Sequence, residues 1–180
     1  GKSRFTLSTL PAEDFPASPQ LEDGTEFHIA RNKFKELLHK TSFCVAVNDV
    51  RYYLMGLLLE IGDGKIFLVG TDGHRMAVAQ QDFASTQPVK VIIPRKAVVE
   101  LAKLLTDSSE EMKIVCDDNH IKFEISDTLT ISSKLIDGNF PDWRSVIPLH
   151  AEKIVVADTA SIKQALTRVS ILSNEKYKGI

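Results

Sequence analysis

The chain has 180 residues, of which 43% are hydrophobic and 26% charged, and its formal net charge is −2. This composition is ordinary for a globular protein, and no apolar run approaches the roughly 20 residues of a membrane-spanning helix. The two cysteines, Cys44 and Cys116, are isolated and lack metal-ligand spacing. We therefore expect both to be reduced core residues of a cytoplasmic protein that carries no metal or cofactor.

The first part of the chain predicts a strand, a helix and a series of further strands. Ala30, Phe34, Leu37 and Leu38 follow the spacing of one helix face, and Gly62-Asp63-Gly64 is typical of a hairpin turn. Residues 11–23 are expected to be a linker. The expected elements are strands at 4–9 and 25–30, a helix at 31–41, and strands at 42–47, 52–61, 65–71 and 75–80.

The second part predicts the same order of elements. Pro94 stands in the first turn of a helix, where its missing N–H costs nothing, and Asp158 is a candidate helix cap. Each half-domain is therefore expected to run strand, helix, three strands. The expected elements are a strand at 89–93, a helix at 95–105, strands at 112–116, 121–125, 129–135 and 154–157, and a helix at 159–169.

The chain also repeats itself. Ile29-Ala30-Arg31 returns 64 positions later as Ile93-Pro94-Arg95, and residues 5–9 resemble residues 129–133 at an offset of 124. We expect residues 24–143 to be one whole domain, preceded by the end of a similar domain in 1–23 and followed by the start of another in 144–180. Domains stacked in a row indicate an arch or ring.

Positive charge gathers in the three expected helices. Residues 30–42, 94–106 and 158–170 carry nine Lys and Arg against three Asp and Glu, so the remaining residues have an excess of eight negative charges. A single basic helix is usually just a solvated face. Three helices at equivalent positions of a repeat favour a basic surface that holds a polyanion by charge.

Several motifs resemble the bacterial sliding clamp, the beta subunit of DNA polymerase III, and the likeness extends over essentially the whole chain. It implies an α+β DNA-clamp fold with two repeated strand-helix-three-strand halves, helices on one face and antiparallel sheets on the other. It further implies a homodimeric ring around double-stranded DNA. The motifs are Asn48–Leu54, Thr71–Met76, Ile93–Lys96, Asp137–Asp142 and Ser173–Tyr177.

The resemblance also implies a surface pocket for short linear motifs of the polymerase catalytic subunit, the clamp loader and other repair proteins. Apolar walls with a polar rim suit such a role. Ser145 departs from the Arg that is common in the family, which removes one charge at the peptide. The implied pocket residues are Leu54, Thr71, Gly73, His74, Arg75, Met76, Pro141 and Val146.

A second implied site is the loop with Asn48, Arg51, Tyr52 and Tyr53, which in the family faces DNA. On its own, a cation beside two tyrosines is more often the solvated end of a strand. With the resemblance, Arg51 is expected to contact phosphate while a tyrosine packs on a sugar or base. Trp143 is expected to pack at a domain junction.

Two other readings remain open from the residues alone. Asp72 and His74 stand two apart, and a small metal-dependent hydrolase would use them as a ligand or acid–base pair. An Asp-Gly turn explains the same residues without any chemistry. A repeat scaffold without a DNA role is the other reading, and the basic helices argue against it. The favoured function is a non-enzymatic processivity factor.

Overall fold

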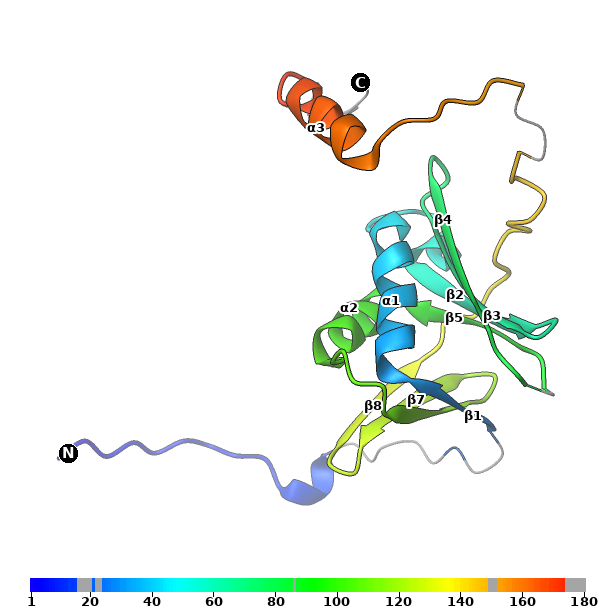
Figure 1. The fold of residues 1–180 in the computed structure, drawn as a ribbon. Helices are drawn as coiled ribbons and strands as arrows, with labels where there is room; N and C mark the ends of the chain where they lie inside the picture. Colours follow the sequence, from blue (N-terminus) through cyan, green and yellow to red (C-terminus); the bar gives the residue numbers. More distant parts are fainter. Residues whose placement is uncertain (16–20, 22–23, 86, 149–151, 174–180) are drawn as a thin grey trace. The chain divides into compact units, whose positions relative to one another are not determined.

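A computed structural model of the chain describes residues 1–15, 21, 24–85, 87–148 and 152–173 (Figure 1). Most of the expected linker between 16 and 23, and residues 174–177 of the last motif, lie outside the described residues. The chain divides into two compact units, Gly1–Trp143 and Arg144–Ile180. Among the described residues, no helix is both long enough and apolar enough to cross a membrane.

The first unit is built on two four-stranded antiparallel sheets. The turn at Asp63-Gly64, which joins two of these strands, has φ values of 53° and 72°. It is the two-residue hairpin that the sequence predicts. One sheet has the order β1 (Thr25–Ala30), β6 (Glu111–Cys116), β7 (His120–Ser126), β8 (Leu129–Lys134). The other has the order β4 (Met76–Asp82), β3 (Lys65–Thr71), β2 (Gly56–Gly62), β5 (Val89–Pro94).

The two halves of this unit exchange their first strands. β1 pairs with β6 of the second half, with Phe27 opposite Ile114. β5 pairs with β2 of the first half, with Ile92 opposite Leu58. Each sheet therefore needs strands from both halves, and neither half can complete its own sheet alone. The starts of β1 and β5 lie 64 positions apart, which is the repeat seen in the sequence.

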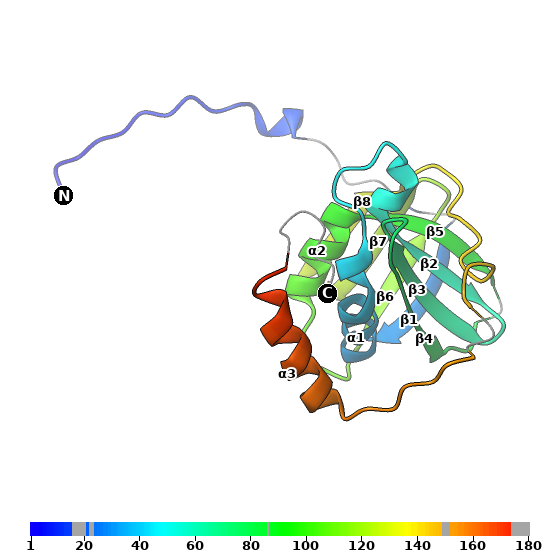
Figure 2. The same cartoon turned by 90° about the horizontal axis from the view of Figure 1, so that it is seen from above.

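Two helices cover one side of both sheets. α1 (Arg31–Thr41) and α2 (Arg95–Leu104) lie side by side there in both views (Figures 1 and 2). Phe34, Leu38 and Leu101 are fully buried in the core between these helices and the strands. Burial of each such side chain stabilises the fold by about 1.5–3 kcal/mol. The predicted arrangement, with helices on one face and antiparallel sheets on the other, is confirmed.

The opposite faces of the two sheets differ. On β6 and β7 the outward side chains are charged, and Lys113 and Lys122 pair with Glu124 at 2.9 and 2.6 Å. The sheet that contains β2 and β3 is apolar on both faces, as the run Leu57–Leu59 indicates. Its outer face carries a second apolar cluster, called here the outer cluster. The outer cluster is Leu58, Phe67, Val69, Ile92, Phe140 and Trp143.

The predicted strand at 42–47 is wrong, and the strand predicted at 52–61 starts later. Short 3₁₀ helices occupy Ser42–Cys44 and Tyr52–Met55, and β2 begins at Gly56. The Ala46 N–H donates to the carbonyl oxygen of Leu54 at 3.1 Å, which closes a loop between them. β2 and β6 start 55 positions apart, not 64, so the first half carries nine extra residues between the start of its helix and the start of its next strand.

The predicted strands at 4–9 and 154–157 are also wrong. Both segments lack regular structure and are exposed, and neither pairs with a strand among the described residues. A strand without a partner leaves its backbone groups unsatisfied within the fold. The described part of the linker contains a 3₁₀ turn at Ala12–Asp14.

The predicted cap and helix of the second unit are confirmed. The Asp158 carboxylate accepts the backbone N–H of Ser161 at 2.8 Å and caps α3 (Thr159–Ser170). α3 buries none of its residues. The apolar positions Ile162, Leu166 and Val169 are 43%, 47% and 56% exposed. The described part of this unit therefore has no core of its own, as the sequence predicts.

Candidate functional site

The turn between β3 and β4 is shaped by its own polar side chains. The Thr71 hydroxyl donates to the carbonyl oxygen of Arg75 at 2.8 Å and accepts the backbone N–H of Gly73 at 3.1 Å. Gly73 has φ 85°, a conformation that side chains with a β carbon disfavour. These contacts hold residues 71–75, called here the β3–β4 turn, in one conformation, and they present His74 and Arg75 to solvent.

Asp72 is the hydrogen-bond acceptor of this turn. One carboxylate oxygen accepts the backbone N–H groups of His74 and Arg75, each at 3.0 Å, and the other accepts Arg75 Nε at 2.9 Å. Partial burial would raise the pKa of Asp72, but these N–H donors together lower it. The carboxylate is committed to turn structure, and the described residues contain no cluster of three metal-ligating groups. The hydrolase alternative therefore finds no support.

Arg75 links the turn to the segment that follows α1. Its Nη2 donates to the carbonyl oxygen of Phe43 at 2.9 Å, and its guanidinium lies 5.8 Å from the centre of the Phe43 ring. Phe43 is 58% exposed, which is high for a phenylalanine. Phe43 was not predicted as a site residue, because residues 42–47 were expected to form a strand. An aromatic residue just after the helix was the available signal.

The outer cluster lies beside this turn. Met76, the first residue of β4, is partly buried and packs against the outer cluster. The Trp143 ring lies 5.4 Å from that of Phe67, and Trp143 Nε1 donates to Glu60 at 3.3 Å. Trp143 thus packs within the first unit, at its last residue. Apolar surface is therefore available next to the polar rim of the turn.

The remaining predicted pocket residues are spread over different environments. Leu54 is only 2% exposed, so in this conformation it offers almost no surface to a partner. Pro141 is exposed. Ser145 and Val146 belong to the second unit, where Val146 is 64% exposed. The structure thus brings Thr71, Gly73, His74, Arg75 and Met76 together in and beside one turn.

The predicted DNA loop is the insertion between α1 and β2. It closes where Ala46 bonds to Leu54, and the Leu54 N–H donates to the carbonyl oxygen of Arg51 at 2.8 Å. The Asp49 carboxylate accepts three hydrogen bonds from Arg51. The donors are Nε at 2.9 Å, Nη2 at 2.8 Å and the backbone N–H at 2.8 Å. These hydrogen bonds from Arg51 lower the pKa of Asp49 to about 2. Asp49 was not predicted as a site residue.

The two tyrosines of this loop differ in exposure. Tyr52 is 54% exposed, whereas Tyr53 is partly buried and packs against the outer cluster. Their ring centroids are 5.9 Å apart in an edge-to-face arrangement. A β carbon at Gly138 would lie 3.3 Å from Tyr52 Cε2, so the segment after β8 supports this ring. Asn48 is exposed at the start of the loop. Tyr52 is therefore the ring better placed to meet a partner.

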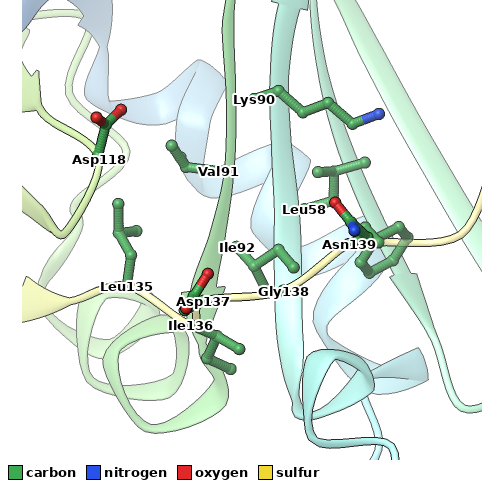
Figure 3. A pocket seen from close by; sticks show the side chains of 11 residues that line it. Leu58, Lys90, Val91, Ile92, Asp118, Leu135, Ile136, Asp137, Gly138 and Asn139 are labelled. Atoms are coloured by element: carbon green, nitrogen blue, oxygen red, sulfur yellow. The ribbon is translucent and has the colours of Figure 1, made fainter.

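Two hollows lie near these residues. One, of about 280 Å³, is formed between β5 and the segment after β8, with Lys90, Asp118 and Asp137 among its polar lining residues (Figure 3). It contains none of the predicted pocket residues. The other, of about 430 Å³, runs between the 46–54 loop and the start of α2. Its apolar lining residues are Val47, Met55, Val99 and Ile136, and its basic lining residues are Arg95 and Lys96.

The positive charge of the two helices is only partly free. Arg31 pairs with Glu110 at 2.7 Å, and Lys35 pairs with Asp107 at 2.9 Å. Lys40 and Lys103 pair with glutamates of their own helices. Within the described ranges, the cations of α1 and α2 that form no ion pair are exposed. They are Lys33, Arg95 and Lys96.

Comparisons with known proteins identify the family to which this architecture belongs. Residues 28–142 match the family described as DNA polymerase III beta subunit, central domain. The chain is 47% identical to the beta sliding clamp of Pseudomonas aeruginosa, over 100% of the chain and 49% of that protein. The crystal structure of this beta subunit from Pseudomonas aeruginosa superposes with a TM-score of 0.89 at 46% identity, covering 98% of this chain and 49% of the other. The Bacillus subtilis sliding clamp gives 0.88 at 30% identity, covering 97% and 46%.

Two half-domains that exchange strands under a pair of helices are thus the architecture of a DNA sliding clamp. The chain belongs to the beta sliding clamp family, the beta subunits of bacterial DNA polymerase III, and its residues 28–142 correspond to their central domain. It spans about half the length of the curated relatives that it matches.

Proposed function

We propose that this chain is the central portion of a DNA sliding clamp, a non-enzymatic processivity factor of the bacterial cytoplasm. Residues 24–143 are its second domain, 1–23 end the first and 144–180 begin the third. The intact protein closes as a homodimeric ring around double-stranded DNA and tethers the replicative polymerase by topology. Family membership over the whole chain supports this proposal, together with the exchanged-strand fold.

The partner site is the β3–β4 turn with the apolar surface next to it. The observation that carries this assignment is the combination of a turn fixed by Thr71 and Asp72 with the partly buried Met76 packed on the outer cluster. A short peptide with a Gln followed by a Leu-Phe pair would bury its apolar side chains there. Pro141 would line the same site, and the roles of Leu54 and Val146 in peptide binding stay predictions. The polymerase catalytic subunit, the clamp loader and repair proteins would carry such peptides.

DNA contacts are expected to be few and sensitive to salt. Tyr52 and Asn48 are exposed in the 46–54 loop, and Lys33, Arg95 and Lys96 are exposed on the helices. Weak contacts of this kind suit a ring that must slide, because a tight grip on phosphate would stop it. Each phosphate neutralised contributes about one unit to the slope of log affinity against log salt.

Retention on circular and linear DNA tests the proposed function. The intact protein, loaded onto nicked circular DNA, is expected to stay bound in high salt and to be released when the circle is cut. A matched linear duplex should not retain it. Equal retention on circle and linear DNA, or tight binding that depends on sequence, would show that the protein does not hold DNA by encirclement.

A further inference from the structure

Arg51 lies between the two candidate sites. It belongs to the 46–54 loop, but its Nη2 donates to the carbonyl oxygen of Asp72 in the β3–β4 turn at 3.4 Å. A β carbon at Gly73 would come within 2.8 Å of Arg51 Nη2 and 2.9 Å of Nη1. The guanidinium therefore rests directly on the turn, and the absence of a side chain at Gly73 makes room for it.

One edge of this guanidinium is paired with Asp49, and the other lies against the turn. The edge formed by Nε and Nη2 is held by the two carboxylate oxygens of Asp49. The edge formed by Nη1 and Nη2 faces Gly73 and the carbonyl oxygen of Asp72. The Asp49 side chain is 18% exposed, so it is largely packed into the loop, while that of Arg51 is 46% exposed. An outside anion can reach Arg51, but a two-bonded contact with it must displace one of these partners.

We propose that Arg51 is a positioning residue of the β3–β4 turn, held there by Asp49, and that a DNA phosphate competes with the turn for its guanidinium. DNA on the loop then weakens peptide binding at the turn, and by linkage a bound peptide weakens the DNA contact by the same factor. This inference rests on the proposed function, because it joins its two sites. It adds that they are coupled through one side chain.

The chemistry predicts different behaviour for arginine and lysine at this position. A lysine keeps a point charge for phosphate, but its side chain is one atom shorter and has no planar fork. It therefore cannot make the paired contact of Nε and Nη2 with Asp49 and also reach the carbonyl oxygen of Asp72. Arg51→Lys should therefore keep a positive charge for DNA but lose the bridge that positions the turn. It should bind peptide more weakly in the absence of DNA, and its peptide affinity should no longer respond to DNA.

The test measures the Kd of a fluorescent Gln…Leu-Phe peptide for the intact protein, with and without a saturating short DNA duplex at low salt. The wild type is expected to show a Kd about fivefold or more weaker with DNA, and Arg51→Lys a ratio near one. Lys113→Ala, on the outer face of the other sheet, is the matched control and should keep the wild-type ratio. Circular dichroism melting confirms that each variant is folded.

The possible failures are distinct. A wild-type protein that does not bind the peptide at all contradicts the proposed partner site. A peptide that binds equally with and without DNA leaves that site intact and overturns the coupling. A DNA effect of the same size in Arg51→Lys also overturns it, because DNA then blocks the peptide without using Arg51.

Discussion

The carbonyl oxygen of Thr41 lies 2.5 Å from the position that a β carbon would occupy at Gly70. Thr41 is the last residue of α1 and is fully buried, and its hydroxyl donates to the carbonyl oxygen of Leu37 at 2.8 Å. Gly70 precedes Thr71, where the β3–β4 turn begins. The end of the helix thus sits on the backbone of β3, and this close approach fixes the starting points of the loop and the turn together.

Replacing Gly70 with alanine should destabilise the fold, because the obstructing atom is a backbone oxygen that cannot turn aside. We expect the free energy of unfolding to fall by about 1–3 kcal/mol, as for other overpacked sites, in urea titrations followed by circular dichroism. Gly62→Ala is the matched control, since a β carbon there meets nothing within 4 Å. Equal midpoints for the two variants would contradict the close approach of Thr41.

Local patterns predicted most of the fold. The alternation in residues 121–125 gave a strand with one buried face, and Asp63-Gly64 gave the hairpin. The exchange of β1 and β5 between halves was not predicted, because strand pairing between distant segments leaves no local mark in a sequence. Residues 42–47 have strand-like composition, yet their backbone is needed to lead from Thr41 into the closed loop. Tertiary context overrides β propensity there.

The candidate site was predictable only in part. The sequence located the β3–β4 turn and the loop as separate motifs, and their assignments to peptide and DNA remain predictions. Asp49 and Phe43 were not predicted, because only the folded structure shows that they contact Arg51 and Arg75. The contact of Arg51 with Gly73 joins segments 22 positions apart and has no signature in either motif.

The Asp49 carboxyl should titrate far below an ordinary aspartate. Its pKa is lowered to about 2, chiefly by hydrogen bonds from Arg51, with a further contribution from the nearby charge of His74. A group with a lowered pKa in the folded state stabilises that state above its unfolded pKa of about 3.9. The Asp49–Arg51 pair should therefore be lost only as the pH falls through about 2.

Carboxyl carbon shifts in an NMR pH titration would measure this. Arg51→Ala should move the Asp49 midpoint back toward about 3.9, while Lys113→Ala, whose side chain pairs with Glu124 instead, should leave it unchanged. A wild-type midpoint near that of a free aspartate would mean that the Asp49–Arg51 pair does not persist in solution.

The two cysteines should resist thiol reagents in the folded protein. Cys44 and Cys116 are free, and only 2% and 4% exposed. Burial raises the pKa of Cys44, and burial together with the charge of Asp117 raises the pKa of Cys116 to about 11. Because the thiolate is the reactive form, labelling at pH 8 should be slow and should accelerate on unfolding in urea. Ser109→Cys, at an exposed position, should react at once; native cysteines reacting at that rate would contradict their burial.

The sharpest prediction concerns Met76 in the proposed partner site. Met76→Lys places a charge against the outer cluster and should abolish binding of a Gln…Leu-Phe peptide, since an unpaired charge on an apolar surface is unfavourable. Met76→Leu keeps the apolar contact and should bind within a few-fold of the wild type. Amide shift mapping with labelled protein would record both, after melting curves establish that each variant is folded.

The location of the peptide site is tested by which amides shift as well as by the affinity. Peptide added to the wild type should perturb the β3–β4 turn, Met76 and Pro141, because its apolar side chains leave water for this surface, worth about 1.5–3 kcal/mol for each one fully buried. Lys113→Ala should bind like the wild type, because Lys113 lies on the other sheet. If the peptide shifted only the Arg51–Tyr53 loop and the helices, leaving residues 71–76 unchanged, or if Met76→Lys bound normally, the peptide site would lie elsewhere on the domain.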